Sequence, residues 1–509
     1  MNLMPAPVRY GSLTIHLRAL DHCPELLPFA QQLSPATPMV WLDSARPHQV
    51  TGRWSLLGYD PWLTVVARGN RLEHHTSGAT QIRVGHPLQT VRELLRRYRP
   101  RASPVVGRRP GTTLGAVSRA IGLLGYLSYE ANQWIERLPM PAWRQRGFAD
   151  RDPVAGPEPE MVWFAMKQLI LLDHSLGRGW VVSVEDPDLP HRQARAEALE
   201  ELDRNTTRLE AVPTHQGAGE SFEPLAQAGA VQATTTQAEF ESMAAQILKH
   251  IQAGDVYQAN LAQRFSTTWQ GTPLALYATL RAMNPSPFAS FLSWGRLAIV
   301  SCSPERLVRV QQGVADSRPI AGTRPRGSTP TEEAVNSLEL LLSEKERAEH
   351  LMLVDLTRND LGRICTAGSV TVDELMALEA YSHVIHIVSN VSGRLRREID
   401  SIDVIRAMFP GGTITGCPKV RCMQILGQLE PVPRGIYTGS LGSLGFDGAL
   451  DLNIAIRTMV IHEDRLSFHV GAGIVADSDP QREYHETLSK AAALMRALER
   501  FGARTIASS

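Results

Sequence analysis

The chain has 509 residues, of which 43% are hydrophobic and 20% charged, as expected for a globular protein that buries a large core. Lysine plus arginine and aspartate plus glutamate both number 52, so the net charge of zero does not favour nucleic acid or an anionic membrane as a partner. The five cysteines are scattered and include no CxxC pair, which argues against a disulfide scaffold and a zinc site.

The N-terminal residues lack both the basic and the apolar segment of a signal peptide. The apolar run at residues 121–127 is far shorter than the ~20 residues that cross a bilayer. We therefore expect a cytoplasmic protein.

The first 200 or so residues predict a mixture of strands and helices. Residues 87–98 have the apolar spacing of an amphipathic helix, and the glycine-punctuated run at residues 121–129 predicts a buried strand. Residues 161–173 and 180–184 predict a pair of strands, and residues 192–209 a charged helix.

Residues 211–235 are rich in Gly, Ala, Gln, Thr and Ser and show no periodicity, which predicts a linker or a mobile surface loop. We place the main boundary of the chain there. It separates an N-terminal region, residues 1–210, from a catalytic region, residues 236–509.

The catalytic region begins with a helix at residues 240–253, closed by Gly254, and an alternating strand at residues 254–265. The other expected elements are a helix at 274–283, a hairpin of 288–294 and 296–302, a helix at 420–429, strands at 453–462 and 465–470, a turn at 471–473 and a final helix at 481–501.

Residues 318–327 form a stretch with two prolines and two glycines, which predicts a loop of fixed shape whose backbone N–H groups are free to meet a ligand. Glu346 and Glu349 follow at a spacing that puts both on one helix face, where like charges call for a cation. The final helix carries Glu483 and Glu486 at the same spacing, and two such pairs would complete a site for Mg²⁺. For Glu346 and Glu349 taken alone, the favoured interpretation is a solvated helix face whose carboxylates pair with Lys345 and Arg347.

Basic and glycine-rich motifs indicate where an anion could bind. Arg457 ends a predicted strand, and Lys490 follows the predicted turn Gly471-Ala472-Gly473, so together they could hold a carboxylate. Residues 411–416 before Lys419 look like a phosphate-binding loop. They do not match GxxxxGK[ST], so nucleotide binding is only weakly indicated.

Together these motifs resemble the catalytic components of the anthranilate synthase and aminodeoxychorismate synthase family, over essentially the whole chain. The matching blocks are residues 303–305, 319–323, 346–360, 381–386, 409–421, 454–458 and 471–478. The resemblance implies an α+β fold with two subdomains, in which antiparallel sheets pack around helices and the active site lies between them. It also implies that the substrate is chorismate, a dicarboxylate, bound through Mg²⁺.

The resemblance also implies a role for individual residues. Glu305 is similar to the general acid that protonates the departing C4 hydroxyl, and His386 to a proton-transfer histidine near C2. From the residues alone, His386 is better interpreted as a core histidine on an apolar strand. Thr323 and Thr413 would orient the ring. The metal ligands would be Glu346, Glu349, Glu483 and Glu486, and the contacts to substrate carboxylates would be Tyr437, Arg457, Lys490 and Gly471, Ala472 and Gly473.

Two positions separate the reactions of the family. Gln258 stands where the water-using relatives have a lysine base, and an amide cannot take a proton from water, which argues against that branch. Ala321 stands where aminodeoxychorismate synthases commonly have a lysine that attacks C2, whereas anthranilate synthases have alanine.

Longer blocks favour the aminodeoxychorismate branch over the anthranilate branch, which remains the alternative. Residues 257–260 are Tyr-Gln-Ala-Asn where the anthranilate branch usually has Phe-Gln-Val-Val, and residues 41–44 depart from the Leu-Leu-Glu-Ser pattern linked to tryptophan feedback. Ser443 replaces a usual aromatic residue without evident reason. Blocks 284–291, 409–416, 429–431 and 439–442 favour the same branch. We therefore predict formation of 4-amino-4-deoxychorismate, the precursor of 4-aminobenzoate and folate.

None of the five cysteines lies in the Gly-x-Cys-x-Gly turn of a class I amidotransferase. We therefore expect ammonia to come from a separate glutamine amidotransferase subunit or from solution. A degenerate, non-enzymatic relative would have lost the site carboxylates, and this chain retains both pairs.

Overall fold

The computed structural model describes residues 7–45, 52–100, 117–118, 120–145, 158–212, 226–380 and 384–504. The elements of the N-terminal half are β1 (Val8–Tyr10), β2 (Leu13–Leu20), α1 (Leu26–Gln31), β3 (Met39–Asp43), β4 (Trp54–Arg68), β5 (Arg71–Thr76), β6 (Thr80–Val84), α2 (Pro87–Arg97), β7 (Gly122–Leu127), η1 (Tyr129–Trp134), α4 (Ala142–Gln145), β8 (Met161–Asp173), β9 (Arg178–Val184) and α5 (His191–Glu210). The helices predicted at residues 87–98 and 192–209 and the strands predicted at 121–129, 161–173 and 180–184 are confirmed.

The second half contains most of the remaining strands. Its elements are β10 (Gln227–Ala228), β11 (Gln232–Ala233), α6 (Gln237–Gln252), β12 (Gln258–Gln270), α7 (Pro273–Met283), β13 (Phe288–Trp294), β14 (Leu297–Ser303), β15 (Arg306–Gln311), β16 (Val314–Ser317), β17 (Ile320–Pro325), α8 (Pro330–Leu342), α9 (Glu344–Gly362), β18 (Thr371–Ala380), β19 (Val384–Arg394), α10 (Ser401–Met408), η3 (Gly412–Ile414), β20 (Gly416–Cys417), α11 (Lys419–Leu429), β21 (Ser440–Gly445), β22 (Leu450–Asn453), β23 (Thr458–His462), β24 (Arg465–Ile474) and α12 (Pro480–Glu499).

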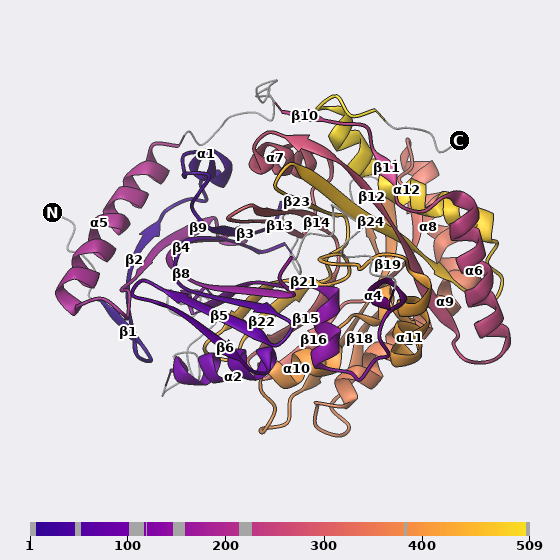
Figure 1. Ribbon diagram of the computed structural model, residues 1–509, viewed down its shortest axis with the longest axis horizontal. Helices are drawn as coiled ribbons and strands as arrows, with labels where there is room; N and C mark the ends of the chain where they lie inside the picture. Colours follow the sequence, from indigo (N-terminus) through magenta and orange to yellow (C-terminus); the bar gives the residue numbers. More distant parts are fainter. Residues whose placement is uncertain are drawn as a thin grey trace.

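The strands form two antiparallel layers that share the long strands β4 and β8. One layer runs β2-β9-β8-β4-β3-β13-β14-β23-β24-β12. The other runs from β6 through β5, β4, β8, β7, β21, β22, β15 and β16 to β19, with β17 and β18 beside it. Helices α5, α2, α10, α9, α6 and α12 surround the strands (Figure 1). The predicted α+β fold is confirmed.

Two large apolar clusters form most of the core, and the larger one contains residues of both layers. The larger core joins β4, β7, β8 and β21 to α2 and α10, with Trp163, Tyr126 and Phe446 fully buried. The second joins β13, β14 and β24 to α7 and α12 around Trp41 and Tyr277. Burial of this apolar area is the dominant favourable contribution to the stability of both layers.

Strands from the two halves of the chain pair directly. Residues 39–43 of β3 pair with β13, and β7 pairs with β21. Within the predicted linker, residues 213–225 lie outside the described part of the chain, while β10 and β11 pair with β12. The boundaries of the predicted regions stay a prediction.

The two helices that carry the paired glutamates are confirmed, and side chains cap both. Ser343 Oγ accepts a hydrogen bond from Glu346 N at the start of α9, and Asp479 caps α12 through Arg482 N. Each glutamate pair therefore lies in the first two turns of its helix, where the positive end of the helix dipole favours a carboxylate.

Three predicted local structures were wrong. Residues 320–325 form the strand β17, not a loop, because their backbone groups pair with β19, and the flexible Gly322 (φ +66°) is a bulge in that strand. Gly471 to Gly473 lie inside β24, paired with β12, rather than in a turn. The strand predicted at residues 453–462 is two strands, β22 and β23, and Arg457 has φ +51° in the bend between them.

None of the helices in the described ranges is both long and apolar enough to cross a membrane.

Candidate active site

The surface at the centre of the candidate site is built by β12 and β24. Asn260 lies opposite Gly473 in the strand register, and Gln258, two residues earlier, points to the same face. A Cβ atom at Gly473 would lie 2.5 Å from Gln258 Nε2, and one at Gly471 would lie 2.6 Å from Asn260 Oδ1 and 2.8 Å from Tyr437 Oη. The glycines therefore let these polar groups approach the strand closely.

Glu305, directly before β15, is the buried acid of the site. Its side chain is 5% exposed, and Thr413 Oγ1 of η3 donates a hydrogen bond of 2.9 Å to its Oε1. Burial raises the pKa of Glu305 to about 7, against the opposing effects of Thr413, the Ile320 N–H and the Arg457 charge. A substantial fraction of Glu305 therefore carries a proton at neutral pH.

His386 lies in β19 and is also 5% exposed. Its Nδ1 lies 3.0 Å from Gly322 O and 3.1 Å from Thr323 Oγ1. Since a carbonyl only accepts, Nδ1 carries the hydrogen and Nε2 carries the lone pair of the neutral ring. Burial lowers the pKa of His386 to about 4, so the ring is neutral near pH 7 and can accept a proton.

Tyr437 and Arg457 border this surface. The buried Tyr437 ring stacks on His469, and burial raises the pKa of its hydroxyl to about 12, so it is a hydrogen-bond donor at neutral pH. Arg457 precedes β23, and its backbone carbonyl accepts a hydrogen bond from Cys302 N. Its positive charge lowers the pKa of both Glu305 and His386, which places it near both.

On α9, the two glutamates are held by residues of other elements. Gln258 Nε2 donates to Glu349 Oε1 at 2.9 Å, and Arg324 Nη1 of β17 lies 3.1 Å from Glu346 Oε1. Burial raises the pKa of Glu349, and the negative charges of Glu346 and Glu486 raise it further. Lys345, the lysine that the solvated-face interpretation pairs with these carboxylates, instead forms its ion pair with Asp477.

On α12, Ser478 Oγ donates to Glu483 Oε1 at 2.6 Å, and burial followed by the charge of Glu486 raises the Glu483 pKa. Glu486 pairs with Lys490 at 2.7 Å, and Lys490 Nζ also donates to Gly471 O at 3.0 Å. The charges of Glu486 and Lys490 both act on Glu349 of α9. The two helices therefore bring their carboxylates into one electrostatic neighbourhood.

Within the described ranges, no three acidic, His or Cys side chains converge as a preformed metal cluster. Each of the four glutamates instead has its own partner: Arg324, Gln258, Ser478 or Lys490. Neighbouring carboxylates raise the pKa of Glu349 and of Glu483, and carboxylate oxygens are the ligands that a hard divalent cation prefers. The donor set therefore fits Mg²⁺.

Hydrogen bonds, ion pairs and charge effects link the predicted site residues, which lie on or next to β12, β15, β17, β19, β24, η3, α9 and α12. Ala321 lies in β17 opposite Ile387, and Ala472 is buried in β24 opposite Leu261. Thr323 is exposed beside His386. Ser443, in β21, faces Leu124 and Asp451, and nothing there explains the serine. Within the 381–386 block, Tyr381, Ser382 and His383 lie outside the described residues.

The weak indication of nucleotide binding was not supported. Lys419 Nζ lies 2.6 Å from Asp360 Oδ2 and is mostly buried, so this lysine anchors α11 to α9. Sequence reasoning also missed Asn260 as a separate site residue. Its Nδ2 donates to Thr413 O, and its Oδ1 is buried without a hydrogen-bond partner among the described residues. Its position two residues after Gln258 in a strand was the available signal.

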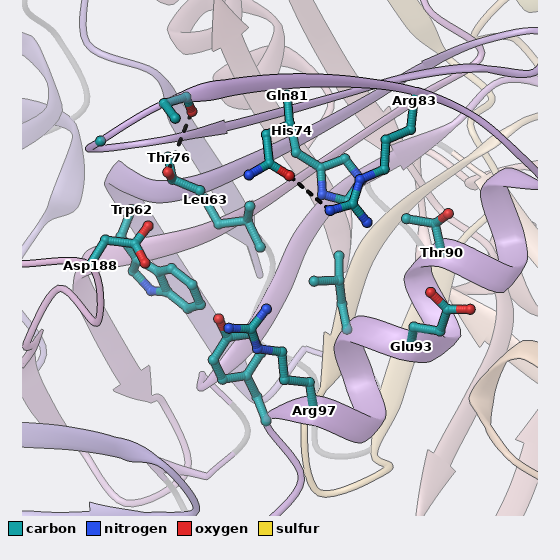
Figure 2. Close-up of a pocket in the computed structure, with 14 residues that line it drawn as sticks. Trp62, Leu63, His74, Thr76, Gln81, Arg83, Thr90, Glu93, Arg97 and Asp188 are labelled. Atoms are coloured by element: carbon teal, nitrogen blue, oxygen red, sulfur yellow. Dashed lines mark hydrogen bonds between the residues drawn. The ribbon is translucent and has the colours of Figure 1, made fainter.

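A pocket of about 590 Å³ lies away from this site, between the β5–β6 hairpin and α2 (Figure 2). The buried side chains of Trp62 and Tyr98 line it, with the two rings edge-on to each other. Its other lining residues include Arg83, Glu93 and Arg97, which are exposed. None of the predicted site residues lines it.

The fold and the gathered acidic and basic groups are those of an enzyme that acts on a small anion. The sequence matches the chorismate binding enzyme family over residues 39–496. It is 38% identical over 479 residues to anthranilate synthase component 1 of Synechocystis, covering 90% of each chain. It is also 38% identical over 461 residues to aminodeoxychorismate synthase component 1 of Bacillus subtilis, covering 90% of this chain and 91% of the relative. The chain belongs to the chorismate-binding enzyme family.

Solved structures agree with this assignment. Anthranilate synthase component I from Streptococcus pneumoniae superimposes with a TM-score of 0.71 at 30% identity, covering 88% of this chain and 93% of that one. The menaquinone-specific isochorismate synthase of Escherichia coli matches with a TM-score of 0.68 at 15% identity, covering 97% and 96%, and shows the shared fold.

Proposed function

We propose that the chain is the synthase component that converts chorismate and ammonia to 4-amino-4-deoxychorismate. The observation that carries the choice of branch is Asn260, whose buried Oδ1 lies beside Gly471 and Tyr437 with no hydrogen-bond partner among the described residues. A buried acceptor of this kind is costly unless a ligand donates to it. The anthranilate branch usually has valine at this position, which cannot accept a hydrogen bond.

In this proposal the substrate carboxylates bind at the end of the site formed by α9 and α12. Glu346, Glu349, Glu483 and Glu486 would hold Mg²⁺, which neutralises the negative charge between these glutamates and the substrate. Arg457, Lys490 and Tyr437 would contact a substrate carboxylate directly.

In this proposal the buried side chains of Glu305 and His386 carry out the proton transfers. Glu305, protonated in part at neutral pH, would give its proton to the departing C4 hydroxyl, which leaves as water. The C4–N bond would form as the C4–O bond breaks, and the incoming ammonia would lose one proton to neutral His386. Thr413 and Thr323 orient Glu305 and His386. Ala321 supplies no nucleophile, so amination proceeds without a covalent bond at this position.

Ammonia would come from a separate glutamine amidotransferase. The relatives support amination of chorismate as the general chemistry, since one is named for aminodeoxychorismate and others for anthranilate.

The direct test incubates the purified chain with chorismate, Mg²⁺ and ammonium at high pH and identifies the product with and without aminodeoxychorismate lyase. We expect 4-aminobenzoate only when lyase is added. Fluorescent anthranilate formed without lyase would overturn the proposal, and the Glu305→Gln variant serves as the inactive control.

Anthranilate synthesis is the second candidate because Ala321 matches that branch. The Ala321→Lys variant tests whether position 321 decides which product forms. An unchanged product distribution would show that it does not.

A further inference from the structure

Arg434 lies between α11 and β21 and is 2% exposed. It makes a bidentate contact with Glu430, through Nε at 2.8 Å and Nη2 at 2.6 Å. Its guanidinium carbon lies 4.8 Å from the Tyr129 ring centre and 5.8 Å from that of Tyr437. The charge is therefore compensated by a carboxylate and by two aromatic faces.

The remaining donors of this guanidinium reach two site elements. Nη1 donates to Ile414 O at 2.9 Å, and Nη2 donates to Asn260 O at 2.6 Å. Ile414 is the neighbour of Thr413 in η3, and Asn260 lies in β12. Glu430 Oε1 also accepts the N–H of Ala262 in β12 at 3.1 Å. One buried ion pair thus ties down both backbone segments that present Thr413 and Asn260.

The same segment joins the N-terminal half to the site. Arg434 N donates to Glu130 Oε1 at 2.9 Å, and Tyr129 N donates to Gly435 O at 2.8 Å. Glu130 and Tyr129 belong to η1, which follows β7.

We propose that Arg434 is a positioning residue for the reaction. It fixes Thr413 against Glu305 and Asn260 against Gly471, and through η1 it couples the N-terminal half to that geometry. Arginine is needed because its planar fork reaches Glu430 and two carbonyls at once, whereas lysine presents one compact charge. The inference rests on the proposed function only for its assay, which follows consumption of chorismate.

The diagnostic readout is the pH dependence of kcat/KM. The hydrogen bond from Thr413 stabilises ionised Glu305, so displacing η3 raises the pKa of this acid and moves the alkaline limb of the profile to higher pH. The other groups that act on Glu305 are Ile320 N–H and Arg457, and the substitution touches neither.

The test compares Arg434→Lys, Thr413→Val and the double variant. We expect each single variant to move the alkaline limb upward and to lower kcat/KM about 10- to 100-fold, as misplacement of a catalytic group does. The double variant should move the limb no further than the larger single effect, because both changes break one connection. Arg281→Lys is the matched control, since Arg281 pairs with Asp43 and lies over Trp41, away from the site.

The proposal is overturned if the alkaline limb of Arg434→Lys lies at the wild-type pH. It is also overturned if the shift in the double variant equals the sum of the shifts in Arg434→Lys and Thr413→Val. If Arg434→Lys does not fold, Tyr129→Leu removes a ring contact without stranding a charge and should shift the limb in the same direction. An unshifted limb in folded Tyr129→Leu would then contradict it. Because chorismate consumption is measured, the result is independent of whether C2 or C4 is aminated.

Discussion

The two ends of the candidate site differ in how fully the protein alone pairs and positions their polar groups. At the acid–base end, Glu305 and His386 are buried, and hydrogen bonds to neutral partners hold them. At the carboxylate end, burial and neighbouring glutamates raise the pKa of Glu349 on α9 and of Glu483 on α12, and Glu486 is exposed. The first end is preorganised by the fold, whereas the second, in our proposal, is completed by a bound Mg²⁺.

The largest expected effect is at the carboxylate end. Glu349→Gln removes one charge from the proposed Mg²⁺ ligands while keeping the shape of the side chain, so Mg²⁺-dependent turnover should be abolished. The rate of chorismate consumption against Mg²⁺ concentration measures this. Glu344→Gln, on the first turn of the same helix and exposed, should behave as wild type. Normal turnover by Glu349→Gln would remove the distinction between the two ends.

At the acid–base end, Glu305→Gln cannot donate a proton and should lower kcat by roughly 10²- to 10⁴-fold. In the wild type, activity should fall as pH rises through about 7, because the pKa of this acid is raised to that value and only the protonated form donates. Rate profiles of the two proteins test this. A wild-type profile that is flat from pH 6 to 8 would show that Glu305 is not the acid.

Gly473→Ala tests the strand surface that lies between the two ends. The added Cβ would lie 2.5 Å from Gln258 Nε2 and 3.7 Å from Glu349 Oε1, so Gln258 must move away from Glu349. We expect KM for chorismate to rise about 10-fold, the loss of a charged hydrogen bond, with a smaller change in kcat. Gly362→Ala, at a helical position with no atom within 4 Å of the added Cβ, is the control. Equal KM values in the two variants would contradict the role given to Gln258.

A further effect is on the free energy of unfolding. The Glu305 pKa rises from 4.5 to about 7 on folding, so ionising it above pH 7 costs the native state roughly 3 kcal/mol. The penalty is absent below the unfolded pKa and grows as pH rises toward the folded pKa. Glu305→Gln should therefore gain stability over wild type at pH 8 and gain none at pH 4. Denaturant unfolding at pH 4 and pH 8 measures the free energy of unfolding of both proteins. If the variant differs from the wild type by the same amount at both pH values, the burial argument is contradicted.

The sequence predicts the helices of the site better than its strands. The spacing of Glu346, Glu349, Glu483 and Glu486 places them correctly on α9 and α12, since helical periodicity is local. The proline- and glycine-rich composition of β17 resembles a loop, and only pairing with β19 makes it a strand.

Arg434 shows what the sequence does not reveal. Its i, i+4 spacing from Glu430 resembles a surface ion pair, yet it is fully buried and its partners come from β12, η3 and η1. The raised pKa of Glu305 has the same origin, because burial by distant segments causes it. Such properties depend on tertiary contacts that a single sequence does not contain.

The most direct test of the contrast between the two ends is the dissociation constant of chorismate, measured by titration calorimetry with and without Mg²⁺. Glu305→Gln is the suitable protein because we expect it to bind substrate while turning it over roughly 10²- to 10⁴-fold more slowly than the wild type. We predict that chorismate binds this variant tightly only with Mg²⁺, and that adding Glu349→Gln removes the dependence. Equal dissociation constants with and without Mg²⁺ in Glu305→Gln would contradict the account.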